Sequence, residues 1–138
     1  ARFVESRDAS VRALLASNPG IPSEWLSRLA GDEDTQVRRA VAKNPETPFE
    51  TLMRLAMDES PSIREYLAGQ PRTSAGMLAF LAEDENARVR RVVADRPQTP
   101  ADSLAVLAED ADKSERRVAL ETLKWRVRPW TRRTPSAI

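Results

Sequence analysis

Apolar and polar residues follow one another along this chain in a pattern that recurs every 26 residues. Within one period, Val37, Ala40 and Val41 occupy positions i, i+3 and i+4, a spacing that places side chains on one face of an α-helix. The equivalent apolar residues of the other repeats are Val11, Leu14 and Leu15; Ile63, Tyr66 and Leu67; and Val89, Val92 and Val93. The pattern therefore predicts a short first helix in each repeat.

Both ends of this first helix can be predicted from residue type. Its start coincides with side chains that accept hydrogen bonds from the free N–H groups of a first helical turn. These residues are Asp8, Asp34, Ser60, Asn86 and Asp112. Its end is expected before the Asn44-Pro45 step and its equivalents, because the residue that precedes a proline is disfavoured in the α region.

A second helix is predicted after the proline step. We expect Thr47 to be its N-cap, Pro48 its first residue and Glu50 the partner in a capping box. Leu52 and Leu55 form its apolar face. Helices this short are unstable alone, so each pair must bury its apolar face against neighbouring repeats. The predicted fold class is an all-α solenoid of 26-residue two-helix repeats.

The repeats start near residues 7, 33, 59, 85 and 111. We expect one solenoid domain over residues 1–128, followed by a basic C-terminal tail over 129–138. The last repeat lacks the Asn-Pro stop, so its helix is expected to run from Asp112 through Trp125, to end before Pro129 and to cap the stack. The chain opens inside the second helix of an earlier repeat, which suggests that the natural protein extends further in the N-terminal direction.

Composition narrows the chemistry that these 138 residues can perform. The chain has no cysteine and no histidine, which excludes thiolate metal sites, Cys nucleophiles and His-based acid–base catalysis. It also has no glycine-rich phosphate loop and no nucleophile–base pair, so we expect no enzyme, no cofactor and no metal. No apolar run reaches the roughly 18–20 residues of a membrane helix, and no signal peptide is visible. We therefore expect a cytoplasmic protein with no membrane partner, and the arginine, alanine and proline content suggests a bacterial source.

The motif D-x-D-x-x-V-R-x-x-V-A-x-N-P-x-T-P-x-x-x-L-x-x-L-A-x-D over residues 32–58 resembles the leucine-rich repeat variant family. The resemblance covers residues 6–121, and the D…VR portion is also similar to the second helix of HEAT repeats. It implies a right-handed superhelix in which an α-helix alternates with a short α or 3₁₀ helix. Neither family implies an enzyme.

Two positions of the repeat carry the same residue type each time, and we call these sets of equivalent residues the arginine column and the aspartate column. The arginines are Arg12, Arg38, Arg64, Arg90 and Arg116, and the aspartates are Asp32, Asp58, Asp84 and Asp110. Each arginine is predicted at the edge of the apolar face, where its guanidinium can reach carboxylates or carbonyls. HEAT repeats use such ladders structurally, and we expect the same role here. The alternative is direct contact between a line of guanidinium groups and an acidic peptide or a phosphate backbone.

Two further groups are candidates for contact with a macromolecule. The position after the arginine varies, with Ala13, Arg39, Glu65, Arg91 and Arg117, which suggests exposure to solvent. The C-terminal segment is basic and aromatic, with Lys124, Trp125, Arg126, Arg128, Trp130, Arg132 and Arg133. Each group has a plain alternative, namely a solvated face for the first and an end cover with a linker for the second.

These patterns together predict a non-catalytic scaffold that presents a curved repeat surface to another macromolecule. We expect that macromolecule to be a protein. The alternative is a nucleic acid bound by the arginine column and the basic segment. The expected oligomeric state is a monomer or a weak oligomer.

Overall fold

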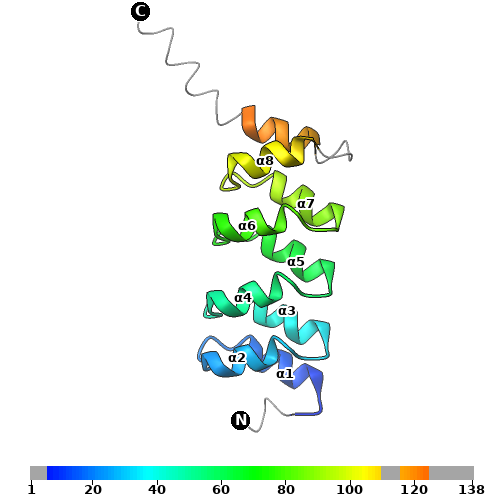
Figure 1. The fold of residues 1–138 in the computed structure, drawn as a ribbon. Helices are drawn as coiled ribbons and strands as arrows, with labels where there is room; N and C mark the ends of the chain where they lie inside the picture. The colour runs from blue at the N-terminus through cyan, green and yellow to red at the C-terminus, as the bar shows by residue number, and fades with distance from the viewer. Residues whose placement is uncertain (1–5, 110–115, 125–138) are drawn as a thin grey trace, which may run out of the picture. The chain divides into compact units, whose positions relative to one another are not determined.

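The computed structural model describes residues 6–109 and 116–124, and every regular element in these residues is a helix (Figure 1). The helices are α1 (Ala9–Ala16), α2 (Ser23–Leu29), α3 (Thr35–Lys43), α4 (Phe49–Leu55), α5 (Pro61–Ala68), α6 (Ala75–Leu81), α7 (Ala87–Ala94) and α8 (Ala101–Ala108), and residues 116–124 are also helical. The two helices of each repeat alternate along the chain, as the 26-residue period predicts. The expected fold class, an all-α repeat solenoid, is confirmed, and the second helices are α-helical.

The chain divides into two compact units, which we describe separately. Unit 1 spans Ala1–Leu67 and unit 2 spans Ala68–Ile138. In unit 1 the first helices α1 and α3 pack side by side, and α2 and α4 lie on the other side of the unit (Figure 1). Three expected features fall outside the described residues: the tail over 129–138, the cap at Asp112 and the end of the last helix before Pro129.

The first helices begin and end where the sequence predicts. Asp34 caps α3, since its carboxylate accepts hydrogen bonds from the N–H groups of Gln36 and Val37. Asp8 caps α1 and Asn86 caps α7 in the same way. Helix α3 stops at Lys43, and Asn44 before the proline is extended, with ψ 122°. Capping chemistry and the proline rule therefore predict these boundaries correctly.

The predicted start of the second helix is wrong by one residue. Pro48 is the extended residue before α4, and no side chain caps that helix. Thr47 faces the other way and donates its hydroxyl proton to the carbonyl of Val41 in the last turn of α3, at 2.6 Å. Thr99 makes the same bond to the carbonyl of Val93, also at 2.6 Å. The threonine hydroxyl therefore joins the two helices of a repeat, and Glu50 closes no capping box with it.

Repeat three departs from the others at this position, because Ser74 replaces the proline. The Ser74 hydroxyl accepts a hydrogen bond from the N–H of Met77 at 3.1 Å and caps α6. A side-chain cap thus takes the place of the fixed backbone angle of proline. The element begins at the equivalent residue in both cases.

Leucines and valines at the predicted apolar positions form the core of each unit. In unit 1, fully buried side chains include Leu26, Leu29, Val37, Leu55 and Ile63; in unit 2 they include Met77, Leu78, Leu81, Val89, Leu104 and Leu107. Some predicted core positions in unit 1 differ. Leu14 departs most and is 73% exposed, and the half-buried ones are Val11, Leu15, Leu52 and Tyr66. Every helix within the described residues is too short to span a bilayer.

Candidate binding surface

Arg12 and Asp32 form the first pair of a polar ladder in unit 1. The guanidinium donates from Nε to Oδ2 at 2.7 Å and from Nη2 to Oδ1 at 3.1 Å. Its Nη1 donates to the carbonyl of Ser6 at 2.6 Å. Arg12 is 8% exposed, so the charge is buried together with its partner. A two-point contact of this kind fixes geometry as well as charge.

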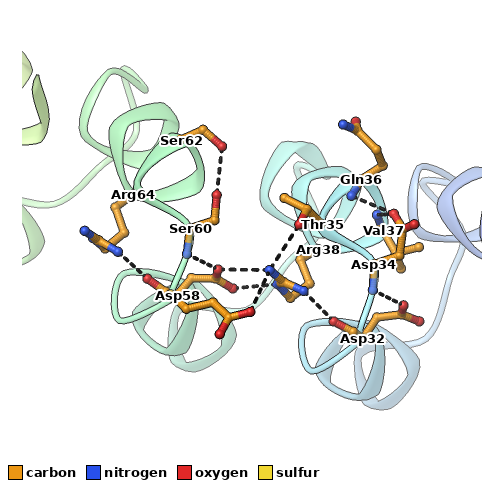
Figure 2. A network of polar contacts seen from close by, with 11 residues as sticks. Asp32, Asp34, Thr35, Gln36, Val37, Arg38, Asp58, Ser60, Ser62 and Arg64 are labelled. Carbon is orange, nitrogen blue, oxygen red and sulfur yellow. Dashed lines mark hydrogen bonds and ion pairs between the residues drawn. The ribbon is translucent and has the colours of Figure 1, made fainter.

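The next arginine continues the ladder in the same pattern. Arg38 donates from Nε to Oδ2 of Asp58 at 2.8 Å, from Nη2 to Oδ1 at 3.3 Å, and from Nη1 to the carbonyl of Asp32 at 2.7 Å. Figure 2 shows Arg38 between Asp58 and the backbone of Asp32, and Arg64 on the backbone of Asp58. Each of these two aspartates thus accepts one arginine on its carboxylate and the next arginine on its carbonyl.

The aspartates are held in place by their own loops. Oδ1 of Asp32 accepts from the N–H of Asp34 at 2.9 Å, and Oδ1 of Asp58 accepts from the N–H of Ser60 at 2.8 Å. Asp84 in unit 2 makes the equivalent bond to Asn86 at 2.8 Å. These local side-chain-to-backbone bonds help to fix the orientation of the carboxylate.

The ladder changes the acidity of its members. Burial by itself raises the pKa of the Asp32 carboxyl. The hydrogen bond from Arg12, the N–H of Asp34 and the charges of Arg12 and Arg38 outweigh that effect, so the pKa of Asp32 lies below its ordinary value. The same hydrogen bond is the main reason that the pKa of Arg12 is raised. The carboxylate is therefore charged at neutral pH.

The ladder residues of unit 2 are described in part. Arg90 donates from Nη1 to the carbonyl of Asp84 at 2.7 Å, as Arg38 does to Asp32. Arg116 is half-buried. Asp110 lies outside the described residues.

Sequence reasoning missed a second ladder, which begins at the residue before the proline. The buried Asn44 side chain donates from Nδ2 to the carbonyls of Ala16 at 2.7 Å and Asn18 at 3.0 Å, both in the preceding repeat. In unit 2, Arg96 donates to the carbonyls of Gly69 and Gln70, and Thr122 donates to the carbonyl of Ala94. The sequence does carry a signal for this second ladder. The position before the proline has a side chain that can donate a hydrogen bond in every repeat, although the residue type changes from repeat to repeat.

The variable column lies on the outward side of the first helices, which we call the first-helix surface. In unit 1 it consists of Ala13, Arg39 and Glu65, all half-exposed; in unit 2 it consists of Arg91 and Arg117, both exposed. Among the described residues, none of these four charged side chains has a hydrogen bond or an ion pair. These four charges therefore have no bonding partner within the described residues.

Among the C-terminal candidates, Lys124 alone lies within the described residues. Lys124 is exposed and forms an ion pair with Glu121 at 3.3 Å. The other members of that group, Trp125, Arg126, Arg128, Trp130, Arg132 and Arg133, lie outside the described residues.

A hollow of about 490 Å³ lies on the first-helix surface of unit 1. Helices α1 and α3 both line it. The lining residues are Ala9, Ser10, Ala13, Leu14, Ser17, Asp34 and Gln36. Figure 2 shows Gln36 on the side of α3 that faces away from Asp32 and Asp58. The hollow and the ladder therefore lie on different sides of α3.

At two positions that line the hollow, the first repeat carries small residues where the second carries long ones. Ala13 is equivalent to Arg39, and Ser17 is equivalent to Lys43. Within the described residues no group of three or more Asp or Glu side chains is placed to hold a metal ion. Alanine, serine and one leucine supply apolar surface and hydroxyl groups, which suit the binding of a side chain.

Comparison with known proteins finds a match between part of the chain and a family model. Residues 37–97 match the family model of the Leucine Rich Repeat Variant domain. That segment contains α4, α5, α6 and α7 complete, and most of α3. No curated protein and no solved structure matches the chain.

Proposed function

We propose that this chain, which carries a Leucine Rich Repeat Variant domain over residues 37–97, is a non-catalytic scaffold whose first-helix surface binds another protein. One observation carries the proposal. The charged residues that recur in every repeat are bonded to one another in unit 1, as Arg38 is to Asp58, whereas those that vary face solvent.

The difference in burial and bonding between the arginine column and the variable column supports this role. Arg12 and Arg38 are buried and keep the loops and helices of successive repeats together. Arg39 follows Arg38 directly but has no partner among the described residues. A scaffold needs a constant interior and a surface that can differ from repeat to repeat, because the stack supplies stability while exposed side chains supply specificity.

A nucleic acid is the alternative partner, and the basic residues of unit 2 favour it. Arg91, Arg117 and Lys124 are exposed there. Against it, the same surface carries the exposed carboxylates of Asp95 and Glu121, which would repel a phosphate backbone. In unit 1, the guanidinium groups of the arginine column already donate to aspartates and carbonyls, so they offer no line of free cations to phosphates.

Site-specific photo-crosslinking in the source cell tests the proposal. A photoreactive amino acid is introduced at Arg39, Glu65 or Arg91 on the first-helix surface. Matched controls carry it at Glu24, Glu50 or Asp102, which are exposed on second helices. We expect discrete protein adducts from the first-helix positions and none from the controls. Adducts from the controls alone, or none at all, would contradict the proposal.

The alternative is tested with the purified chain and labelled DNA and RNA in fluorescence anisotropy. Contacts between cations and phosphates release counterions, so true binding weakens steeply from low to moderate salt. We expect no change in anisotropy at low salt. Binding with a steep salt dependence would replace the protein partner by a nucleic acid.

A further inference from the structure

We propose that the hollow beside α1 receives one large apolar side chain from an acidic peptide segment of the protein partner, and that a carboxylate of that segment binds Arg39. This inference rests on the proposed function and names the chemistry of the partner at one place on the first-helix surface of unit 1. It follows from the size of the hollow, the exposure of Leu14 and the charges around them.

The hollow has the size and lining of a side-chain pocket. Its volume of about 490 Å³ lies within the range of roughly 300–1,000 Å³ that is common for ligand sites. The side chains of Ala9, Ala13 and Leu14 give it apolar walls, and Ser10 and Ser17 add hydroxyl groups. A leucine, phenylalanine or tryptophan side chain of a partner finds apolar contact on these walls.

Leu14 is the apolar residue that such a contact would cover. It is 73% exposed, whereas the equivalent Ala40 is 8% exposed and the equivalent Tyr66 is half-buried. A single exposed leucine is ordinary on a protein surface. This one stands at the wall of a hollow, so one side chain of a partner can remove both apolar surfaces from water together.

The charges next to the hollow favour an acidic segment. Gln36 of α3 lines the hollow, and Arg39 follows it one turn later on the same helix, half-exposed and without a partner among the described residues. Lys43 lies a further turn on, with its ammonium 5.8 Å from the centre of the Tyr66 ring. A basic segment along this line would meet two cations, whereas an acidic segment would form charge-assisted hydrogen bonds.

Asp34 is the charged residue among those that line the hollow, and its position determines which way round the peptide segment binds. Asp34 stands at the start of α3, and its carboxylate accepts hydrogen bonds from the N–H groups of Gln36 at 2.8 Å and Val37 at 3.3 Å. An acid of the partner would be repelled at that end. The acidic residue of the partner is therefore expected toward Arg39, with the apolar residue in the hollow.

A peptide selection on the whole chain tests this assignment. A displayed library of random short peptides is selected against the wild type, and the affinity of each selected peptide is measured by fluorescence polarisation. The variants are Leu14→Gln, Ala13→Trp, which fills the hollow, and Arg39→Glu. Arg91→Glu is the matched control, because Arg91 occupies the equivalent column in unit 2. Leu14→Gln changes an exposed residue, so it keeps the test valid if Ala13→Trp disturbs the fold.

We expect the selected peptides to share one large apolar residue beside Asp or Glu. Their affinity should fall about tenfold or more for Leu14→Gln and for Arg39→Glu, and should stay unchanged for Arg91→Glu. A repeated selection on Arg39→Glu should favour basic peptides. Peptides that lose affinity only with Arg91→Glu would overturn this inference and leave the proposed function standing. Basic peptides from the wild type, or peptides indifferent to all four changes, would also overturn it.

Discussion

Arg38 binds Asp58 through two guanidinium nitrogens, and both side chains are 7% exposed. The two residues are 20 positions apart in the chain, at the beginning and the end of one repeat. Because Arg38 also donates to the carbonyl of Asp32 in the preceding repeat, one side chain ties the loop before its own repeat to the loop that leads into the next one. The repeat period of the sequence is thus expressed as a bond that crosses from each repeat to its neighbour.

Replacement of Arg38 by alanine should destabilise the chain by about 3 kcal/mol, because it leaves the carboxylate of Asp58 buried without its cation. Arg38→Lys should restore only part of the loss, since one ammonium cannot reproduce the two-point contact. Urea unfolding followed by circular dichroism measures the difference.

Arg39→Ala is the matched control for this change. Arg39 is adjacent in sequence, half-exposed and unpaired among the described residues, so its loss should alter the free energy of unfolding by less than about 0.5 kcal/mol. Equal effects of the two substitutions would contradict a structural role for the ladder.

The lowered pKa of Asp32 predicts how stability depends on pH. A carboxyl whose pKa is lower in the folded than in the unfolded chain stabilises the fold above its unfolded pKa, and this stabilisation is lost as the pH falls through the folded value. The free energy of unfolding should therefore begin to decline below about pH 5. Asp32→Asn should remove this contribution, so the variant should differ most from the wild type at neutral pH and least in acid.

Urea unfolding at a series of pH values checks this prediction. Glu24→Gln is the control, because Glu24 is exposed on α2 and outside the ladder. Its curve should run parallel to that of the wild type. An Asp32→Asn curve that is also parallel would mean that the Arg12–Asp32 pair contributes nothing to the pH dependence.

The residues that the sequence predicted well are those whose role depends on their own chemistry. Asp34 caps α3 because a carboxylate before a helix accepts its free N–H groups, whatever lies around it. The 26-residue period places Arg38 in the arginine column and Asp58 in the aspartate column, so the pairing could be expected from residue type and period. Local chemistry and periodicity together determine most of this fold.

The features that could not be predicted depend on neighbours in space. A Thr-Pro-x-Glu segment fits a helix that starts at either of two residues, and the segment by itself does not show that the Thr47 hydroxyl bonds to the carbonyl of Val41. The exposure of Leu14 depends on what packs over it, since its spacing is that of a core residue. The hollow beside it arises from two helices and is not visible in either one alone.

Thr47 should contribute to stability through its hydroxyl. Thr47→Val keeps the size of the side chain but removes the donor to the carbonyl of Val41, so we expect a loss of about 1–2 kcal/mol. Thr51→Val is the control, because Thr51 is also buried but its hydroxyl bonds no described residue. That change should be close to neutral. Thermal unfolding separates the two, and a similar loss in both would argue against the bond between the helices.

Leu78→Ala and Leu52→Ala should differ, although the two residues occupy the same column. Leu78 is fully buried, so its truncation leaves a cavity and should cost about 3 kcal/mol. Leu52 is half-buried, and we expect roughly 1–2 kcal/mol there. Denaturant unfolding of both variants checks the order, and a larger cost at Leu52 would contradict the packing of α4.

Asn44 should be more sensitive to a change of charge than to truncation. Its amide donates to the carbonyls of Ala16 and Asn18 and accepts from the N–H of Glu46 at 2.8 Å, so Asn44→Ala should lose about 2–3 kcal/mol. Asn44→Asp keeps the acceptor but replaces the donor by a carboxylate that faces two carbonyl oxygens in a buried place. The aspartate variant should therefore be the less stable at neutral pH and should recover in acid, where a protonated carboxyl can donate again. Unfolding of both variants at neutral and acidic pH checks this order, and an aspartate variant that does not improve relative to the alanine as the pH falls would contradict the burial of this side chain against the two carbonyls.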